Sequence, residues 1–513
     1  MSHGLTADIL AVLLFIVSIF GVLAGYPIAF SLAGFSLFFA LAGWLLGVFD
    51  PIILTSLPSR YFGLMTSEIL VAVPLFVFMG AVLERSKIAE ALLETMGQMF
   101  GAVRGGLAIS VVIVGALLAA STGVVGATVV TMGLLSLPAM MRAGYDPRLA
   151  TGVICASGTL GQIIPPSIVL IFVGDLLMGA NQLAAQRRGI APDPVSVGDL
   201  FIGAIFPGLA LVGLYILSVL GLAIFRPASC PALKMTAEEK ASLGRRFIRA
   251  LVPPLLLIVA VLGSILTGFA TPTEAASIGA IGSLVLAALN RALSFATLLA
   301  VMRNTATISA LVFAIVLGVS VFSLVFRGLG GEHLVEQVLT SVPGGLTGAI
   351  LAVMAVMFIL GFFMDTLEIV LITVPITAPT IIALGADPVW LGVMIGVNLQ
   401  TSFLTPPVGF ALFYMRGVAP ASITTGQIYR GAIPFVALQV LAILVLWEFP
   451  GLATWLPKVV FSDPVAAVSA PGPGGAPAAN PLDQLLQMPA GTPGPTNDPT
   501  LDRLLGGGGQ QRN

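Results

Sequence analysis

Apolar segments long enough to cross a bilayer recur as far as about residue 450, and they constrain the fold more than any other feature. A membrane-spanning helix needs about 20 apolar residues. Hydrophobic residues make up 58% of the sequence and charged residues only 9%, whereas a soluble domain carries about 25% charge. Because the charged surface of a soluble fold is missing, the sequence predicts an all-α polytopic membrane protein. The predicted spans are 7–24, 26–48, 66–84, 147–179, 198–225, 250–268, 275–298, 305–327, 388–416 and 430–448.

Charge and cysteine usage argue against several other classes. The formal net charge is -1, so the basic footprint of a nucleic-acid-binding protein is absent and no nucleic-acid partner is expected. Cys155 and Cys230 lie far apart and neither belongs to a CxxC pair, so we expect no disulfide framework or zinc site. The first apolar segment lacks a basic leader and a small-residue cleavage site, so we interpret it as a span rather than a removed signal peptide.

Two further apolar stretches, about 105–141 and 344–384, carry a small or polar cluster in the middle. The clusters are STGVVGAT at 121–128 and MDTLE at 364–368. Each suits the tip of a re-entrant helical hairpin, because non-helical backbone is tolerated at membrane depth only where protein or a watery cavity covers it. The alternative is that one of these stretches crosses the membrane completely.

Lysine and arginine residues predict the orientation. The densest basic loop, 226–249, is assigned to the cytoplasm. Counting spans from this loop in both directions places both termini on the opposite side of the membrane. Arg187, Arg188 and Arg327 then lie outside against the rule, and the count fails if either hairpin is a full span. The tail is rich in Pro, Gly and Ala and is predicted to be disordered. The predicted parts are a first half at 1–226, a cytoplasmic linker at 227–249, a second, inverted half at 250–450 and the tail at 463–513.

Adjacent prolines interrupt two of the spans, Pro165–Pro166 in GQIIPPSIVL and Pro406–Pro407 in TSFLTPPVGF. Proline removes a backbone donor and clashes with the preceding turn, so the pairs predict broken helices at 147–179 and 388–416. Both halves read P-x5-G-x-D-P-x17-P-P when aligned at an offset of 241 residues, from Pro165 to Pro406. This spacing indicates an internal repeat, and the odd number of spans between the hairpins predicts that the second copy is inverted.

Inverted repeats with interrupted helices at matching positions are typical of secondary transporters, whose ion and substrate sites lie at the breaks. Each break frees carbonyls that can coordinate a cation, and each begins a half-helix whose N-terminus can face an anion. Hydroxyl and carbonyl oxygens suit Na+ better than a soft metal. The alternative is a pair of proline kinks relieved by neighbouring helices. The sodium candidates are Ser121, Thr122, Gly123, Ile164, Pro165, Pro166, Met364, Asp365, Thr366, Thr405 and Pro406.

Polar residues beside the breaks are candidates for a substrate path, although such side chains also bond neighbouring helices. Asp365 is an intramembrane acid and hence a functional hypothesis, and the alternative for it is a hairpin tip that reaches water. Thr271, Pro272 and Glu274 have a local explanation as the N-cap, N1 and N3 residues of a capping box. The substrate-path candidates are Ser167, Asn398, Gln400, Thr401, Ser402 and Pro407.

The stretches GQIIPPSIVLIF, TPTEAAS and LTPPVGFALF resemble signatures of the large membrane subunit of TRAP transporters, the tripartite ATP-independent periplasmic class. The resemblance covers residues 7–450. It implies an elevator-type secondary transporter of the bacterial inner membrane that imports an organic acid with Na+ as the coupling ion. It also implies two partners, a soluble periplasmic substrate-binding protein and a small four-helix membrane subunit on a separate chain. Both termini would then be periplasmic. Val124 and Val125 stand where the tip of the family's first hairpin is rich in serine. A side chain at these positions cannot bind Na+, so only backbone carbonyls are expected to do so there.

Other functions fit the sequence less well. The alternative transporter is a stand-alone proton- or sodium-coupled carboxylate carrier with a similar two-hairpin fold. An intramembrane enzyme would need paired carboxylates, an activated nucleophile or metal ligands, and the sequence contains no HExxH, DDxxD or GxGD motif. An ATP-driven pump is disfavoured because GxxxxGK[ST] is also absent from the sequence. A channel would show flux that neither saturates nor concentrates the substrate.

Overall fold

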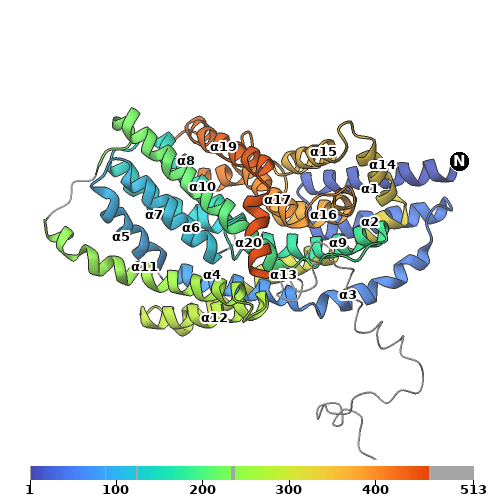
Figure 1. The fold of residues 1–513 in the computed structure, drawn as a ribbon, viewed down its shortest axis with the longest axis horizontal. Helices are drawn as coiled ribbons and strands as arrows, with labels where there is room; N and C mark the ends of the chain where they lie inside the picture. Colours follow the sequence, from blue (N-terminus) through green and yellow to red (C-terminus); the bar gives the residue numbers. More distant parts are fainter. Residues whose placement is uncertain (1, 87, 123–124, 233–236, 462–513) are drawn as a thin grey trace, which may run out of the picture. The chain divides into compact units, whose positions relative to one another are not determined.

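The computed structural model describes residues 2–86, 88–122, 125–232 and 237–461, and every regular element in these ranges is a helix (Figure 1). The tail predicted at 463–513 lies outside the described residues. Short 3-10 turns are η1 (Pro51–Ser56), η2 (Leu160–Gln162) and η3 (Pro227–Ser229). The α-helices are α1 (Ser2–Leu23), α2 (Ile28–Leu45), α3 (Leu57–Met65), α4 (Glu68–Arg85), α5 (Ile88–Gly101), α6 (Gly106–Thr122), α7 (Val125–Arg142), α8 (Pro147–Thr159), α9 (Ile168–Arg188), α10 (Val197–Phe225), α11 (Ala237–Leu266), α12 (Pro272–Leu289), α13 (Phe295–Gly328), α14 (Gly331–Ser341), α15 (Gly345–Leu360), α16 (Thr366–Ala383), α17 (Pro388–Leu404), α18 (Phe410–Val418), α19 (Thr425–Glu448) and α20 (Gly451–Phe461).

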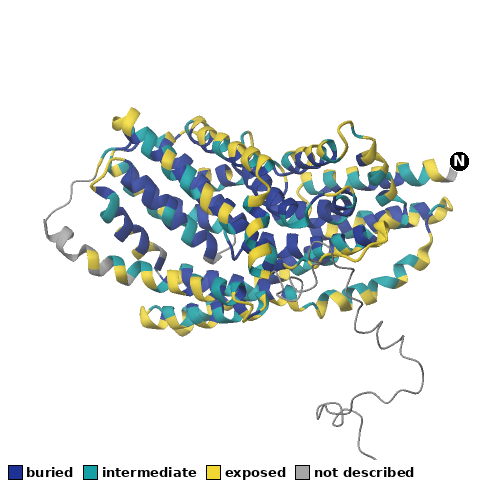
Figure 2. Ribbon diagram, viewed as in Figure 1, coloured by how far each residue is buried: buried dark blue, intermediate teal, exposed yellow. Residues whose placement is uncertain are grey.

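The helices have the length and surface of a membrane protein. Within the described ranges, 9 helices are long and apolar enough to span a bilayer, or 10 if the pair Pro51–Met65 and Glu68–Arg85, bent by 52°, forms one span. Large apolar side chains point outward, and Phe30 and Phe225 are 76% and 85% exposed. Figure 2 shows exposed residues along α12, whereas the central α16 and α17 are buried. The predicted all-α, multi-pass membrane class is confirmed.

The helix start predicted at Thr271 is confirmed, and the two Asp-Pro steps of the repeat motif also begin helices. The Asp146 carboxylate accepts a hydrogen bond from the Arg148 amide at 2.8 Å at the start of α8. At the start of α17, the Asp387 carboxylate accepts from the Val389 amide at 2.9 Å. Thr271 and Glu274 form the expected capping box at α12. These caps satisfy amide groups that have no partner within the helix.

The two proline pairs break helices as predicted, and the repeat is visible in the packing. α8 and α9 flank the first pair, and α17 and α18 flank the second. α6–α7 and α15–α16 form two helical hairpins, and α7 shifted by the repeat offset gives α16. α7 packs along α18, and α16 packs along α9. One helix of each hairpin thus packs on the half-helix that begins after the proline pair of the other repeat copy. This reciprocal packing is expected for two copies related by a twofold axis.

One predicted span has the wrong bounds. The span 275–298 crosses a turn, because α12 ends at Leu289 and α13 begins at Phe295. Ser294 caps α13 by accepting a hydrogen bond from the Thr297 amide at 3.1 Å. Asn290 and Arg291 mark this turn in the sequence, and the prediction overlooked them because the apolar run continues on both sides.

The predicted linker at 227–249 is held at its start and is helical at its end. The Ser229 carbonyl accepts a hydrogen bond from the Asp146 amide at 2.9 Å, at the entrance to α8. The Cys230 carbonyl accepts from the Gly105 amide at 3.0 Å, at the base of the first hairpin. From Ala237 onward the chain is helical, because α11 extends into the span predicted at 250–268.

Candidate functional site

The first break is buried and closed by its own side chains. Pro165 and Pro166, joined by a cis peptide bond, provide no amide hydrogen for the carbonyls of Gly161 and Gln162, four positions earlier. The Ser167 hydroxyl donates to the Gln162 carbonyl at 3.0 Å. Ser167 also caps α9, because its oxygen accepts from the Leu170 amide at 3.5 Å. Ser167 is 0% exposed, so the carbonyl freed at Gln162 is already occupied.

The second break is more open, and it brings backbone oxygens together. Pro406 and Pro407, also joined by a cis peptide bond, deprive the Ser402 and Phe403 carbonyls of their helical partners. Gly409 caps α18 with φ 44°, and no side chain supports the cap. A Cβ atom on Gly409 would lie 3.0 Å from the Phe403 carbonyl oxygen and 3.0 Å from the Thr405 carbonyl oxygen. Two carbonyl oxygens therefore face one small space.

Two side-chain hydrogen bonds fix the backbone just before and just after the second proline pair. The Thr405 hydroxyl donates to the Thr401 carbonyl at 2.7 Å, which leaves its lone pairs available. The Tyr429 hydroxyl on α19 donates to the Pro407 carbonyl. Pro407 is exposed and Thr405 and Pro406 are half-buried. Carbonyl and hydroxyl oxygens at a partly open break are the ligand types that a hard cation prefers.

The tip of the second hairpin contacts both breaks. Gly361 packs so closely on α17 that a Cβ atom there would lie 2.0 Å from the Ser402 hydroxyl oxygen. The Thr366 hydroxyl accepts a hydrogen bond from the Gln162 side-chain amide at 2.7 Å. Met364 is buried at this tip. Thr366, predicted beside the second break, therefore meets the first break through Gln162.

Asp365 has a structural task at the same tip. Its carboxylate accepts a hydrogen bond from the Leu367 amide at 3.3 Å, and its own amide donates to the Glu368 carboxylate at 3.0 Å. The two acids form the capping box that begins α16. A carboxylate at this position also stabilises the positive end of the helix dipole. The ligand role predicted for Asp365 stays a prediction.

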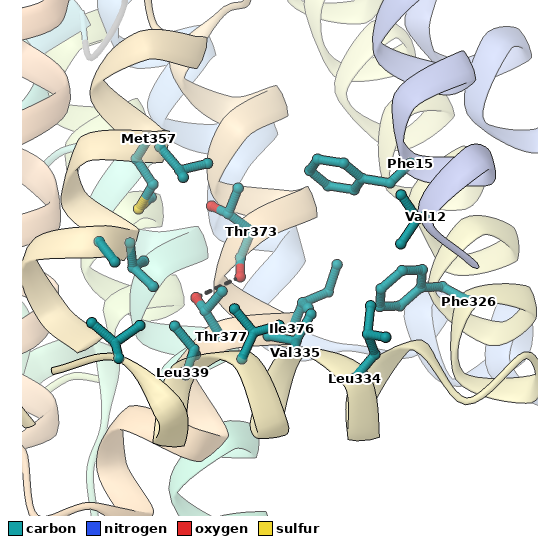
Figure 3. Close-up of a pocket in the computed structure, with 15 residues that line it drawn as sticks. Val12, Phe15, Phe326, Leu334, Val335, Leu339, Met357, Thr373, Ile376 and Thr377 are labelled. Carbon is teal, nitrogen blue, oxygen red and sulfur yellow. Dashed lines mark hydrogen bonds between the residues drawn. The ribbon is translucent and has the colours of Figure 1, made fainter. Parts of the chain in front are cut away.

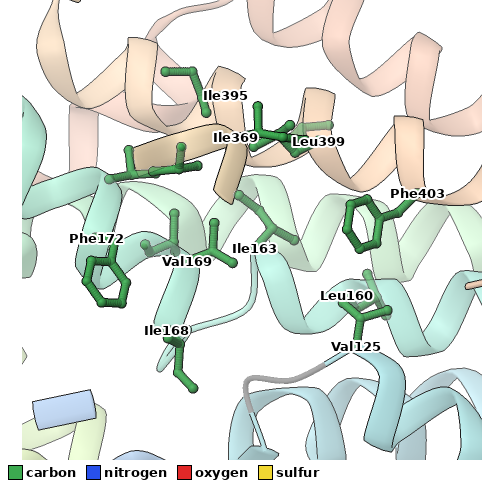
Figure 4. Close-up of a cluster of buried hydrophobic side chains, with 14 of the residues drawn as sticks. Val125, Leu160, Ile163, Ile168, Val169, Phe172, Ile369, Ile395, Leu399 and Phe403 are labelled. Atoms are coloured by element: carbon green, nitrogen blue, oxygen red, sulfur yellow. The ribbon is translucent and has the colours of Figure 1, made fainter. Parts of the chain in front are cut away.

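The described part of the first hairpin lies close to the first break. A Cβ atom on Gly161 would lie 3.5 Å from the Ala119 carbonyl oxygen of α6. Figure 4 shows Val125, the first residue of α7, next to Leu160 at the start of η2, and Phe403 of α17 belongs to the same apolar cluster. Gly123 lies outside the described residues, and the structure describes Ser121 and Thr122 only as the last residues of α6. The ligand roles of these three residues remain untested.

The predicted substrate-path residues on α17 all have internal partners. Asn398 donates to the Met354 carbonyl of α15 at 2.9 Å. Gln400 donates to the Thr159 and Tyr215 hydroxyls at 3.4 Å and 3.3 Å. The hydroxyls of Thr401 and Ser402 donate to carbonyls within α17, both at 2.8 Å. Bonding between neighbouring helices is thus visible for Asn398 and Gln400, and the path role stays a prediction.

An apolar cavity of about 270 Å³ lies apart from the breaks, between α1, α14 and the hairpin α15–α16 (Figure 3). Its walls include Phe15, Phe326 and Leu334. The Thr373 hydroxyl donates to the Ile369 carbonyl at 2.6 Å, and the Thr377 hydroxyl donates to the Thr373 carbonyl at 2.8 Å. A carboxylate would lose its hydration here without gaining a donor, so this cavity does not suit an organic acid.

Sequence reasoning missed four residues that shape the site: Gln162, Tyr215, Gly409 and Gln439, whose amide donates to the Tyr215 hydroxyl at 2.8 Å. Gln162 lies inside the motif GQIIPP, and Gly409 follows the second proline pair by two positions. Both could have been found from their distance to a break. Gln439 is a polar residue in an apolar span, which is also a visible signal. Tyr215 gave no signal, since a single tyrosine in a membrane helix is ordinary.

The comparisons with known proteins agree with this architecture. The chain matches the model of the tripartite ATP-independent periplasmic transporter DctM component over residues 12–452. It is 30% identical over 420 residues to the C4-dicarboxylate TRAP transporter large permease protein DctM of Pseudomonas aeruginosa, covering 80% of this chain and 91% of that protein. It is also 30% identical over 395 residues to the ectoine TRAP transporter large permease protein TeaC of Halomonas elongata, covering 76% and 87%.

A solved structure shares the fold at low sequence identity. The YdaH transporter of Alcanivorax borkumensis superimposes with a TM-score of 0.56 at 15% identity, covering 79% of this chain and 88% of that one. The likeness covers most of both chains, so the overall helical fold described above is one already known from a solved structure. The chain belongs to the DctM component family of tripartite ATP-independent periplasmic transporters, whose members are permease subunits and not enzymes.

Proposed function

We propose that this protein is the large permease subunit of a sodium-coupled, binding-protein-dependent secondary transporter that imports an organic acid across the bacterial inner membrane. The observation that carries the proposal is the second break. There the carbonyl oxygens of Phe403 and Thr405 converge at Gly409, beside the hydroxyl of Thr405. Oxygen ligands without a nearby thiolate or imidazole favour a hard monovalent or divalent cation over a soft metal.

A cation at this break would help to bind an anion. The half-helix α18 begins at the same break, and its N-terminal amides carry partial positive charge. A bound Na+ adds a full positive charge next to them, which favours the carboxylate of a substrate. The first break offers a second half-helix, α9, which begins at Ile168. Two matched breaks of this kind support ion and substrate sites near the middle of the membrane.

Helix packing supports an elevator motion. α2, α4, α12 and α13 pack on one another and form a scaffold. The broken helices pack on the hairpins of both copies, as α8 does on α7 and α9 does on α16. The second group carries every predicted site residue, so it could move as one body against the scaffold and carry ion and substrate with it.

The names of the relatives support the proposed substrate class and partners. The relatives' names refer to C4-dicarboxylate and to ectoine, and both ligands carry a carboxylate. A tripartite transporter needs two further components, for which we propose a small four-helix membrane subunit and a soluble periplasmic binding protein. Periplasmic termini would place the basic residues 226–249 in the cytoplasm, where the positive-inside rule favours them.

Reconstitution tests the proposal. The purified protein and the small membrane subunit would be reconstituted together in liposomes, and the soluble binding protein would be added outside. Uptake of labelled succinate and of other organic acids would then be measured. We expect uptake that requires the binding protein and an inward sodium gradient. Uptake without any binding protein would instead support a stand-alone carrier. Equal uptake driven by a proton gradient without sodium would overturn sodium coupling.

A further inference from the structure

Four polar side chains meet in the apolar interior, where α8, α10, α17 and α19 converge. The Gln439 amide donates to the Tyr215 hydroxyl at 2.8 Å and to the Thr159 hydroxyl at 3.5 Å. The Gln400 amide donates to the same two hydroxyls. All four side chains are 0% exposed. We refer to Thr159, Tyr215, Gln400 and Gln439 as the polar node.

The node lies on the twofold axis that relates the repeats. Thr159 and Gln400 are 241 residues apart, which is the offset of the proline pairs, so equivalent positions touch each other. A neighbouring pair of contacts behaves in the same way. The Cys155 thiol lies 3.6 Å from the Ala411 carbonyl. The equivalent residues are Gly396 and Leu170, and a Cβ on Gly396 would lie 3.7 Å from the Leu170 side chain.

The node also lies next to both breaks. Thr159 is the last residue of α8, directly before η2 and the first proline pair. Gln400 lies in the last turns of α17, five positions before Thr405. The first half of each broken helix therefore ends in the node. Tyr215 and Gln439 belong to neither broken helix, and they join the two ends from outside.

The node is costly to bury. Burying these four polar groups removes them from water, and each hydrogen bond between them contributes only about 0.5–1.5 kcal/mol in net terms. The hydrogen bonds do give the crossing a defined geometry, as does the edge-to-face contact of Tyr215 with Phe435 at 5.4 Å between ring centroids. Orientation, rather than stability, is what this arrangement supplies.

We infer that Tyr215 and Gln439 are positioning residues that couple the two breaks, so that sodium binding at one break favours binding at the other. The inference rests on the proposed function. A cation that draws carbonyls together at the second break would displace the end of α17 and, with it, Gln400. The node passes this displacement to Thr159 and to the end of α8. By reciprocity, ion binding at the first break would act on the second through the same contacts.

The sodium dependence of succinate uptake by the complete reconstituted transporter tests the coupling. Two coupled sites give the wild type a Hill coefficient of about 2. Tyr215→Phe keeps the ring and its contact with Phe435 but removes the hydroxyl that accepts from both amides, and Gln439→Leu removes one of the two donating amides. We expect both variants to lower the Hill coefficient toward about 1, with unchanged membrane abundance and binding-protein requirement. Since the two side chains share a hydrogen bond, their double variant should resemble each single variant.

The control is Ser283→Ala in α12, a buried hydroxyl that bonds only within its own scaffold helix. It should leave the Hill coefficient unchanged. A wild type that needs no sodium would overturn the proposed function itself. A sodium-dependent wild type with a Hill coefficient of about 1, or variants that keep the wild-type coefficient, would overturn only the coupling. If one variant does not reach the membrane, the other still decides, because both break the same node.

Discussion

Each of the two breaks contains a pair of adjacent prolines, but the backbone around the two pairs is capped and exposed differently. At the first break, the Ser167 hydroxyl donates a hydrogen bond to the freed Gln162 carbonyl. Ser167 also caps α9 and is 0% exposed. At the second, Gly409 caps α18 without a side chain, and Val408 is 36% exposed. Ser167 and Val408 occupy equivalent positions of the repeat, so the break with a hydroxyl at this position is closed and the break without one is open. The second break is therefore more open than the first, although both contain the same proline-pair motif.

The largest expected effect comes from the hairpin contact at the second break. In Gly361→Ala, the new Cβ would lie 2.0 Å from the Ser402 hydroxyl oxygen and 2.7 Å from its Cβ atom, so rotation of one side chain cannot relieve the clash. We expect a loss of about 1–3 kcal/mol in the free energy of unfolding and near-complete loss of uptake. Thermal unfolding of the purified protein and liposome uptake measure the two effects.

The first repeat supplies the control and the rescue for this variant. Its equivalent residues are Ala120 and Gly161, with the glycine on the broken helix instead of the hairpin. In Gly161→Ala the nearest atom would be 3.5 Å away, so the effect should be small. The double variant Gly361→Ala with Ser402→Gly recreates the first repeat's arrangement and should recover most of the uptake. If it recovers none, the clash with Ser402 is not the cause.

The second largest effect should fall on sodium affinity. In Gly409→Ala, the new Cβ would occupy the space between the Phe403 and Thr405 carbonyl oxygens, and φ 44° is unfavourable for alanine. We expect the half-saturating sodium concentration for uptake to rise about tenfold, equivalent to ~1.4 kcal/mol. Gly417→Ala in the same half-helix meets no atom within 4 Å and serves as the control. Equal sodium curves for both variants would show that Gly409 does not adjoin the ion.

Ser167→Ala probes the closed break, and we expect stability to change more than sodium affinity. The variant loses an N-cap, worth about 1 kcal/mol, and leaves the buried Gln162 carbonyl without its hydroxyl donor. A decrease of about 1–2 kcal/mol in the free energy of unfolding should follow. Thermal unfolding and the sodium dependence of uptake are compared with those of Gly409→Ala. A shift in half-saturating sodium as large as that of Gly409→Ala would instead make the Ser167 hydroxyl itself an ion ligand.

Sequence alone predicted the features that depend on local chemistry. Prolines, glycines and caps act within a few residues, so the breaks, the hairpins and the capping box at Thr271 were predictable. The same capping pattern at Asp365 and Glu368 was overlooked, because an acid in an apolar stretch suggested a ligand. Contacts such as Gln162 with Thr366 join residues 204 positions apart, and only the packed structure reveals them.

The smallest expected effect concerns the outer edge of the open break. Tyr429→Phe removes the hydroxyl that donates to the Pro407 carbonyl but keeps the ring. Since Pro407 is exposed, water can replace the lost donor, and the cost should stay below about 1 kcal/mol. We expect a less than fivefold change in half-saturating sodium and an unchanged melting temperature, both measured beside the wild type. A loss of uptake as complete as that expected for Gly361→Ala would show that Tyr429, and not the hairpin contact, holds the second break in shape.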